Sequence, residues 1–322
     1  MDNNGFMSDL KRRILHQLIA WSCGDDGDYG LYSGNGGIML VLFEQSRQQM
    51  NKPLNHYAMG LLEKGMCLLQ KGDLLRTPAM PDPLLIGWII AEGHRREYFD
   101  ADMEENMPVF DDLMLQRVRS LRTKDSAAGS DLPVLVSFMI SRYRSLYGKE
   151  DTRARQVLDC LDSVVRNITD GYGCGLAGNW IIYGMLVENK ICHGISSEYL
   201  DWLPGFTMEK IRAGECGTEE LYLIWRISGF YDNDTGIEGL RTCLQTRLAC
   251  IDGMPLEHKV RLLEKWGVTR YFFYPDSIMD DPYWDACIKT VDAPILDNLM
   301  NKRVAGGNFS ANEGLCSLLT IL

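Results

Sequence analysis

The chain has 322 residues, of which 46% are apolar, and its formal net charge at neutral pH is −11. This charge argues against a nucleic-acid partner and against binding to an anionic membrane surface. No stretch approaches 18 uninterrupted apolar residues, and residues 1–5 lack the pattern of a secretory signal, so we expect neither membrane insertion nor secretion.

The ten cysteines are spread thinly, without a Cys-x-x-Cys pair. Several fall on predicted helix faces, where a reduced cysteine packs as a small buried hydrophobic residue. Because free thiols persist in reducing compartments, we expect a cytoplasmic protein.

Two kinds of helix alternate along the chain. The first helix of the chain is predicted over residues 8–22 and is amphipathic, with apolar residues on one face. A glycine-rich turn at 30–37 then leads into the apolar run 38–43. A helix that is apolar on all sides must be surrounded by protein, whereas a helix with one apolar stripe lies at the surface.

The same alternation continues to residue 322. The second surface helix is predicted to start at Asn51 and Pro53. Asparagine can cap a helix N-terminus, and proline is tolerated in the first helical turn. Further surface segments are predicted around 109–118, 151–168, 196–212 and 237–248, and one more beginning at Pro282. Further enclosed helices are predicted at 84–90, 134–140 and 179–183, after Gly217, after Pro255 (a short one) and at 318–322.

We call the turn at 30–37 a glycine corner, because its glycines have the spacing G-x-x-x-G-x-x-G. Gly30, Gly34 and Gly37 of this corner match Gly171, Gly175 and Gly178. Partial copies occur at 215–220 and 309–315. Their separations fit units of about 47 residues, which indicates a repeat architecture of seven units.

Seven enclosed helices alternating with seven surface helices predict an inner ring within an outer ring, as a single domain over 1–322. The apolar segment 318–322 can then pair with the first surface helix and close the ring. Glycine suits the crowded corners, because it permits close backbone approach and positive φ. The helix N-termini would face a central bowl, where we expect a peptide or small-molecule ligand.

The corners and enclosed helices together resemble the lanthionine synthetase C-like proteins, over essentially the whole chain. The resemblance implies an α/α toroid of seven inner and seven outer helices. It also implies peptide modification, in which a cysteine thiol adds to a dehydrated serine or threonine. In that family, two cysteines and a histidine at the fifth and sixth corners bind zinc, which favours the thiolate.

The chain departs from this family at the zinc site. Its fifth corner, 215–220, has a cysteine one place late and lacks the family's proline and final glycine. The sixth unit has His258 but no Cys-His pair. The tripeptide Cys-His-Gly occurs instead at 192–194, away from the corners, and we interpret it as a coincidence.

A rearranged metal site remains one hypothesis. Cys174 and Cys216 hold equivalent places in neighbouring units, and His258 or Glu220 could complete a zinc shell with them. The simpler interpretation, which we favour, is that both cysteines are small residues filling crowded turns.

Three functions therefore stay open: a thiol-adding peptide cyclase, a peptide-binding relative without catalysis, and a carbohydrate-active enzyme. The last needs two opposed carboxylates, for which Glu219, Glu220 and Glu313 at the corners are the candidates. We favour instead that these carboxylates stabilise helix N-termini. Trp88, Trp180 and Trp225 lie in enclosed helices and are interpreted as core residues rather than sugar platforms.

Overall fold

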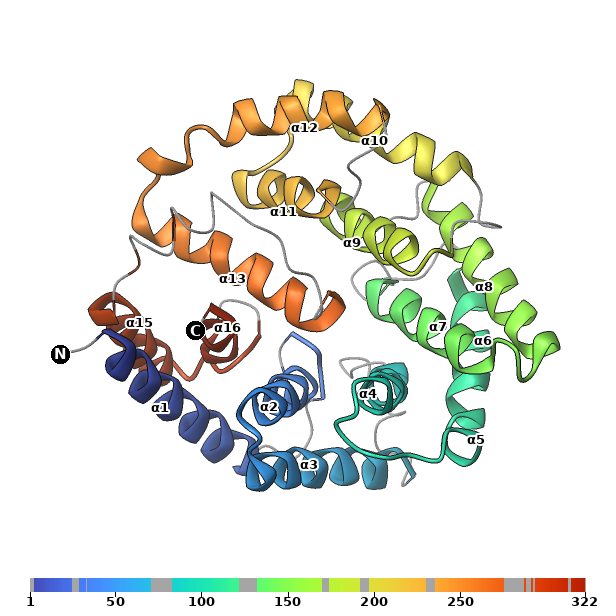
Figure 1. Ribbon diagram of the computed structural model, residues 1–322, viewed down its shortest axis with the longest axis horizontal. Coiled ribbons are helices and arrows are strands. Elements are labelled where there is room, and N and C mark those ends of the chain that lie inside the picture. Colours follow the sequence, from blue (N-terminus) through green and yellow to red (C-terminus); the bar gives the residue numbers. More distant parts are fainter. Residues whose placement is uncertain are drawn as a thin grey trace. The chain divides into compact units, whose positions relative to one another are not determined.

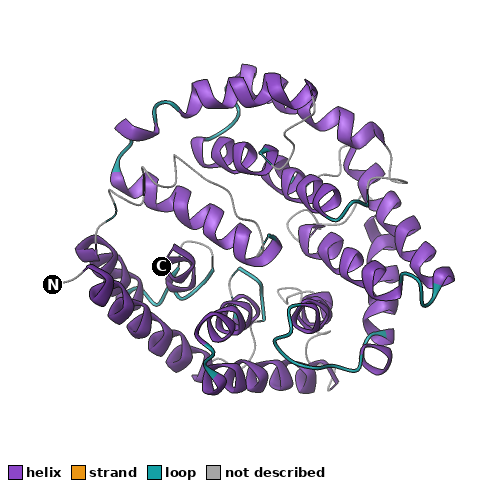
Figure 2. Ribbon diagram, in the orientation of Figure 1, coloured by secondary structure: helices purple, strands orange, loops and turns teal. Residues whose placement is uncertain are grey.

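The protein is all-helical. The computed structural model describes residues 3–24, 29–32, 34–70, 83–121, 132–169, 174–191, 197–229, 235–274, 287, 291, 293–311 and 314–321. Over these ranges the regular structure is helical and no strand occurs (Figure 2). This confirms the predicted all-α class, while the closed double ring stays a prediction. None of the described helices is both long enough and apolar enough to cross a membrane.

The chain forms two compact units. Unit 1 combines Met1–Ile89 with Cys250–Leu322, and unit 2 is the continuous stretch Ile90–Ala249. The boundary at Ile89 and Ile90 falls within helix α4 (Pro83–Arg95).

Unit 1 is built around the enclosed helix α2, whose residues from Asn35 to Ser46 are all buried. Asn51 begins the next helix as predicted, since its side-chain oxygen accepts a hydrogen bond from the Leu54 amide at 3.2 Å. Besides the start of α4, unit 1 contains α1 (Asn3–Gly24), α2 (Asn35–Gln49), α3 (Lys52–Gln70), the 3-10 turn η2 (Ile251–Gly253), α13 (Leu256–Phe273), α15 (Ala293–Ala305) and α16 (Leu315–Ile321).

The last helix of unit 1 packs against the first. Helix α16 is buried and contacts α1, α2, α13 and α15 (Figure 1). Near it, the rings of Trp21 and Phe309 stack with centroids 5.4 Å apart. The predicted pairing of the final apolar helix with the first surface helix is therefore confirmed.

A buried ion pair ties α13 to α15 and α16. Arg303 donates to both carboxylate oxygens of Glu264, one bond measuring 3.0 Å, and to the carbonyl oxygen of Gly314 at 2.7 Å. The Glu264 side chain is only 2% exposed, and Ser317 donates a further bond to it at 2.8 Å. The arginine thus compensates a charge that burial would otherwise make costly.

Unit 2 has two layers of helices. Helices α7, α9 and α11 contact one another in succession, and α8, α10 and α12 pack on them (Figure 1). Besides the end of α4, the elements of unit 2 are α5 (Met103–Asn106), α6 (Pro108–Leu121), α7 (Leu132–Leu146), α8 (Asp151–Thr169), α9 (Gly175–Glu188), α10 (Ser197–Ala213), α11 (Thr218–Ser228) and α12 (Thr235–Leu248).

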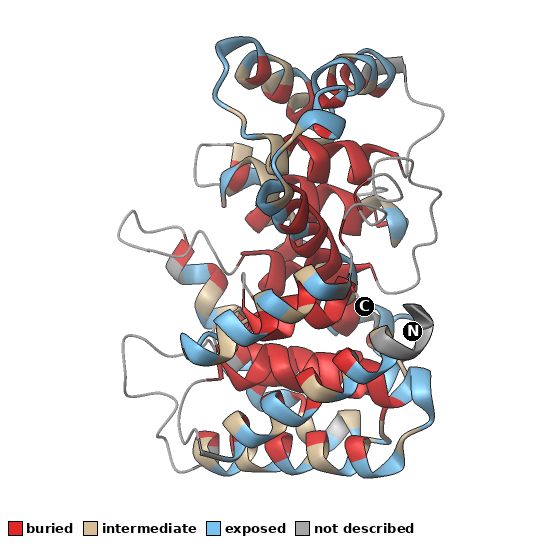
Figure 3. Cartoon of the chain, turned by 90° about the vertical axis from the view of Figure 1, so that its left-hand side faces the viewer, coloured by how far each residue is buried: buried red, intermediate tan, exposed pale blue. Residues whose placement is uncertain are grey.

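The two predicted kinds of helix are visible in the burial pattern. Figure 3 shows helices that are buried along most of their length and others on which buried and exposed turns alternate. Trp88, Trp180 and Trp225 are at most 5% exposed, which confirms them as core residues.

A buried carboxylate organises the end of α4 within unit 2. Glu92 accepts hydrogen bonds from Arg95, Arg96 and Ser141, and the nearer Arg95 nitrogen lies at 2.8 Å. Burial alone would raise the pKa of Glu92, but the charges of Arg96 and Arg95 outweigh that effect and lower it to about 2.

The glycine corners are crowded at one aligned position, whereas Gly175 and Gly217 have no atom within 4 Å of where a Cβ would stand. A Cβ atom on Gly37 would overlap the carbonyl oxygen of Leu31, and one on Gly178 would lie 2.5 Å from the Cys174 sulfur. Gly314, which takes the place of Gly37 in the partial copy at 309–315, is equally enclosed by the backbone of Ser310. These three aligned positions therefore have no room for a side chain.

Three sequence predictions differ from the structure in detail. The apolar pattern of the segment 109–118 predicts Val109 on the buried face of its helix, but Val109 is 53% exposed, because Phe110, Met114 and Val118 form that face. Helix α13 is 18 residues long rather than short. Helix α15 was not predicted, although Leu296 and Met300 have helical spacing and are buried.

Candidate functional site

A pocket of about 580 Å³ lies within unit 2, where the starts of α9 and α11 meet α10. We call it the aromatic pocket. It includes the glycine corner residue Gly175, whose φ of +77° is readily adopted only by glycine. The pocket is lined by Ile168, Thr169, Gly175, Leu176, Asn179, Trp202, Phe206, Lys210, Glu215, Cys216 and Glu220.

One face of α10 supplies an aromatic wall. Trp202 and Phe206 stand one helical turn apart, and their rings stack with centroids separated by 4.7 Å. Tyr199 extends the row, with its ring 6.1 Å from that of Trp202. Tyr199 is held in place by its hydroxyl, which donates to the carbonyl oxygen of Asn179 at 2.7 Å. The stacked rings of Trp202 and Phe206 therefore form a surface on which an apolar or aromatic group can pack.

Charged groups stand at the end of this wall. Lys210 lies 5.5 Å from the centre of the Phe206 ring and forms a 2.5 Å ion pair with Glu215. The hydrogen bond and charge of Glu215 raise the pKa of Lys210. Both charges are partly exposed, so the pair contributes little to stability and remains accessible to a ligand.

Glu220 joins two helices of the pocket. It lies in the first turn of α11, and its carboxylate accepts a hydrogen bond from the Ala177 amide of α9 at 3.1 Å. Amides in a first helical turn have no partner within their own helix. Glu220 therefore stabilises a helix N-terminus, as the interpretation that we favour predicts. The helix that it stabilises is the neighbouring α9, whereas Glu220 itself belongs to α11.

The other two predicted carboxylates do not line the pocket. Glu219 is half-buried in the first turn of α11 and is not among the lining residues. Glu313 lies outside the described residues, as does the tripeptide 192–194. A pair of opposed carboxylates is therefore not assembled from Glu219 and Glu220.

Both cysteines lie in environments that raise the pKa of their thiols. Burial raises the pKa of Cys174 to about 12, and its sulfur donates to the side-chain oxygen of Asn179 at 3.3 Å. Burial also raises the pKa of Cys216, with Glu220 and Glu215 adding to the effect. A thiol that acts as a nucleophile requires a lowered pKa instead, so that it is present as the thiolate. This environment supports the interpretation of both cysteines as small residues that fill turns.

The predicted zinc shell of Cys174 and Cys216 with His258 or Glu220 stays a prediction. His258 is exposed on α13 in unit 1, and the two cysteines and Glu220 lie in unit 2. Within the described ranges, no three His, Cys, Asp or Glu side chains are grouped as metal ligands would be.

Comparisons with family models, curated proteins and solved structures found no match for this chain. The aromatic pocket is therefore identified as a candidate site from its geometry alone.

Sequence reasoning missed Trp202 and Phe206. Their four-residue spacing was visible in the partly charged segment 196–212, but the same spacing is typical of an ordinary buried helix face. Only the packing of α9 and α11 beside α10 shows that these two rings border a pocket.

Proposed function

We propose that this chain is a divergent relative of the lanthionine synthetase C-like proteins, and that it binds a peptide in the aromatic pocket without modifying it. The alternation of enclosed and one-faced helices and the crowded glycine corners support this relationship, including the α/α toroid that it implies. None of the nine described cysteines forms a disulfide bond, which supports a cytoplasmic location.

The observation that carries the proposal is the stacked Trp202–Phe206 pair on the wall of a pocket of about 580 Å³. This volume lies within the usual range of ligand sites. The apolar side chains of Ile168 and Leu176 extend the wall, so an aromatic or aliphatic peptide side chain can be enclosed there. Glu215 and Lys210 at its end offer contacts to charged or amide groups of the peptide.

The absence of catalysis is supported by how the reactive groups are used. Glu220 holds the amide of Ala177, Glu215 pairs with Lys210, and the two thiols have raised pKa values. Neither a thiolate nucleophile nor a free pair of carboxylates is available among these residues.

Binding can be tested with end-capped hexapeptides carrying phenylalanine, leucine or alanine at the centre, measured by fluorescence anisotropy. We expect the phenylalanine and leucine peptides to bind, and Trp202→Ala to weaken that binding about tenfold or more, since a buried aromatic contact is lost. Trp21→Ala is the matched control, because Trp21 stacks in unit 1 and is not part of the pocket.

Two results would contradict the proposal. Equal binding by the wild type and Trp202→Ala would exclude the aromatic wall as the site. Saturable binding of an oligosaccharide, with none of any peptide, would support the carbohydrate alternative, which the aromatic wall could also serve.

Catalysis is tested separately, with a dehydrated peptide that contains a cysteine. Addition of the thiol to the dehydro residue leaves the mass unchanged but consumes one free thiol. Alkylation of the remaining thiols followed by mass spectrometry therefore detects cyclisation. We expect every peptide thiol to remain alkylatable, whereas a protein-dependent loss of alkylation would show that the chain is a cyclase.

A further inference from the structure

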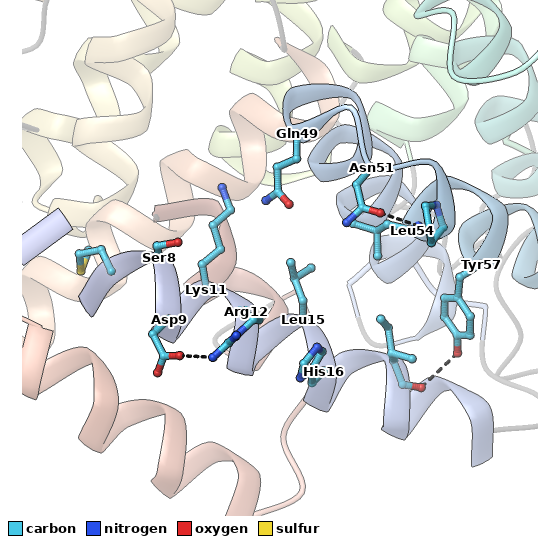
Figure 4. A pocket seen from close by; sticks show the side chains of 13 residues that line it. Ser8, Asp9, Lys11, Arg12, Leu15, His16, Gln49, Asn51, Leu54 and Tyr57 are labelled. Carbon is cyan, nitrogen blue, oxygen red and sulfur yellow. Dashed lines mark hydrogen bonds and ion pairs between the residues drawn. The ribbon is translucent and has the colours of Figure 1, made fainter. Parts of the chain in front are cut away.

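A larger groove lies in unit 1 between α1 and the segment that joins α2 to α3 (Figure 4). We call it the α1–α3 groove, and its volume is about 990 Å³. Buried Leu15 and Leu54 provide apolar surface, and the remaining lining is largely polar. The lining residues are Met7, Ser8, Asp9, Lys11, Arg12, Leu15, His16, Ile19, Gln49, Asn51, Pro53, Leu54 and Tyr57.

Lys11 is the distinctive residue of this groove. Its half-buried side chain extends from α1 toward the side of the groove lined by Gln49 (Figure 4). Burial lowers the pKa of its ammonium group. Within the described part of the chain, Lys11 forms no ion pair or hydrogen bond. A half-buried charge without a partner is unfavourable, and an anionic ligand would compensate it.

The charged neighbours of Lys11 are already paired. Arg12 binds Asp9, the acidic residue in the lining, at 2.6 Å, and Arg13 binds Asp297 at 2.6 Å. Asp9 is therefore held by another cation, and Lys11 supplies an uncompensated positive charge to the groove.

The opposite side of the groove offers amide groups. Gln49 donates to Gln45 at 3.2 Å, which leaves its side-chain oxygen as an acceptor. Asn51 accepts a bond from the Leu54 amide through its oxygen, which leaves its side-chain nitrogen as a donor. A peptide backbone presents both complementary groups, N–H and C=O, at each ordinary residue.

The length of the groove fits an extended peptide. Its α1 side runs from Met7 to Ile19, which at the rise of an α-helix is about 18 Å. An extended chain covers that length with about five or six residues. Lys11 lies between the two ends, so a bound chain would continue on both sides of it and would meet Lys11 with a side chain rather than with its terminus.

We propose that the α1–α3 groove binds an extended acidic peptide, with an aspartate or glutamate side chain of that peptide paired with Lys11. The single unpaired lysine among the described lining residues of the groove, in a chain of net charge −11, suits one carboxylate better than a polyanion such as nucleic acid or an anionic membrane. The groove lies in unit 1, and the proposal does not depend on the aromatic pocket of unit 2.

The test uses the full chain and a labelled hexapeptide with acetylated and amidated ends, in which a central glutamate is the only charge. A second hexapeptide has glutamine in place of the glutamate. We expect the glutamate peptide to bind at least tenfold more tightly by fluorescence anisotropy, and we expect added salt to reduce this preference.

Lys11→Met removes the charge but keeps an apolar stem, so we expect it to bind both peptides equally and weakly. Lys11→Arg should retain the preference for glutamate. Lys52→Met is the matched control, since Lys52 is exposed on neighbouring α3 and is not part of the groove. Trp202→Ala should leave binding of the glutamate peptide unchanged, which separates this result from any failure of the aromatic pocket.

Several outcomes would overturn the proposal. One is equal affinity of the wild type for the two peptides, and another is unchanged preference in Lys11→Met while circular dichroism shows that it is folded. A third is tight binding of a glutamine peptide only when its C-terminus is free, because the groove would then take a chain end. Lys11-dependent binding of anionic vesicles, with no binding of either peptide, would also overturn it.

Discussion

The aligned corner glycines Gly37, Gly178 and Gly314 show how the absence of a Cβ atom permits a tight turn. Gly37 lies in the first turn of α2, where an added Cβ would overlap the carbonyl oxygen of Leu31. The neighbouring backbone would have to move to accept it, because interiors are close-packed.

Gly37→Ala should therefore destabilise the protein by about 2 kcal/mol, within the range for overpacked sites. Gly60→Ala is the matched control, since Gly60 lies within α3 and has no neighbouring atom where its Cβ would stand. The control should stabilise the protein by about 0.5–1 kcal/mol, because alanine favours a helix. Urea unfolding followed by circular dichroism measures both changes, and equal effects of the two substitutions would refute this explanation.

The second prediction concerns how the buried carboxylate of Glu92 makes stability depend on pH. Its pKa of about 2 in the folded protein lies below the ordinary value of 4.5, so ionised Glu92 favours the folded state. This stabilisation is fully present above the ordinary pKa and is lost as pH falls from about 4.5 to about 2. Glu92→Gln removes it by replacing the carboxylate that accepts hydrogen bonds from Arg95 and Arg96 with a neutral amide.

The free energies of unfolding of wild type and Glu92→Gln should therefore differ most at pH 7. The difference should become smaller by about 2 kcal/mol at pH 3, where Glu92 of the unfolded chain is protonated. Comparison of the two proteins at each pH removes the effects of other titrating groups. A difference that does not change with pH would show that the Glu92 pKa is not lowered.

At the scale of elements, two ion pairs attach α15 to its neighbours in unit 1. Arg303 and Glu264 are 12% and 2% exposed and join α15 to α13, whereas Arg13 and Asp297 are 41% and 31% exposed and join α1 to α15. Both are arginine–carboxylate pairs, but they differ in their exposure to water. This exposure determines how much each pair contributes to the stability of the protein.

Arg303→Met should cost about 3–5 kcal/mol, because it leaves the carboxylate of Glu264 buried without a cation. Arg13→Met, the matched control, should cost at most about 1 kcal/mol, because its pair is partly exposed. Chemical unfolding of each variant provides the comparison. A small loss in Arg303→Met, no larger than that of its control, would mean that Glu264 is stabilised by other groups such as Ser317.

Most helices were predictable because their signals are local. The enclosed helices α2, α4 and α7 are predictable from apolar runs that polar residues hardly interrupt, and the start of α3 from its asparagine cap. Helix α15 was missed because its buried face is formed by few residues among polar ones, and its position depends on its packing against α1 and α16.

The candidate sites were less predictable, because each one combines groups from separate helices. The importance of Trp202 depends on α9 and α11, and that of Lys11 depends on the opposite side of its groove around Asn51. Periodicity shows which face of a helix is apolar, but it does not show which neighbour covers that face. The unpaired state of Lys11 is likewise visible only once the pairings of Arg12 and Arg13 are known.

At the scale of the whole molecule, one unit is formed by a continuous stretch of the chain and the other by two separate stretches. Unit 2 uses the uninterrupted stretch Ile90–Ala249, whereas unit 1 joins Met1–Ile89 to Cys250–Leu322. In unit 1, contacts such as Arg13–Asp297 connect residues 284 positions apart. Such distant contacts form slowly, because loop closure must precede them.

This division imposes an order on events at the ribosome. At about 5–20 residues per second, the stretch that forms unit 2 takes roughly 8 to 30 seconds to synthesise. Throughout that time, α2 has been made but α13 and α16, which cover it in unit 1, have not. The part of the α2 surface that α13 and α16 cover is therefore still uncovered in the nascent chain after all the residues of unit 2 have been made, whereas α1 and α3 can already pack on the rest. We expect that uncovered part to be what a molecular chaperone would shield.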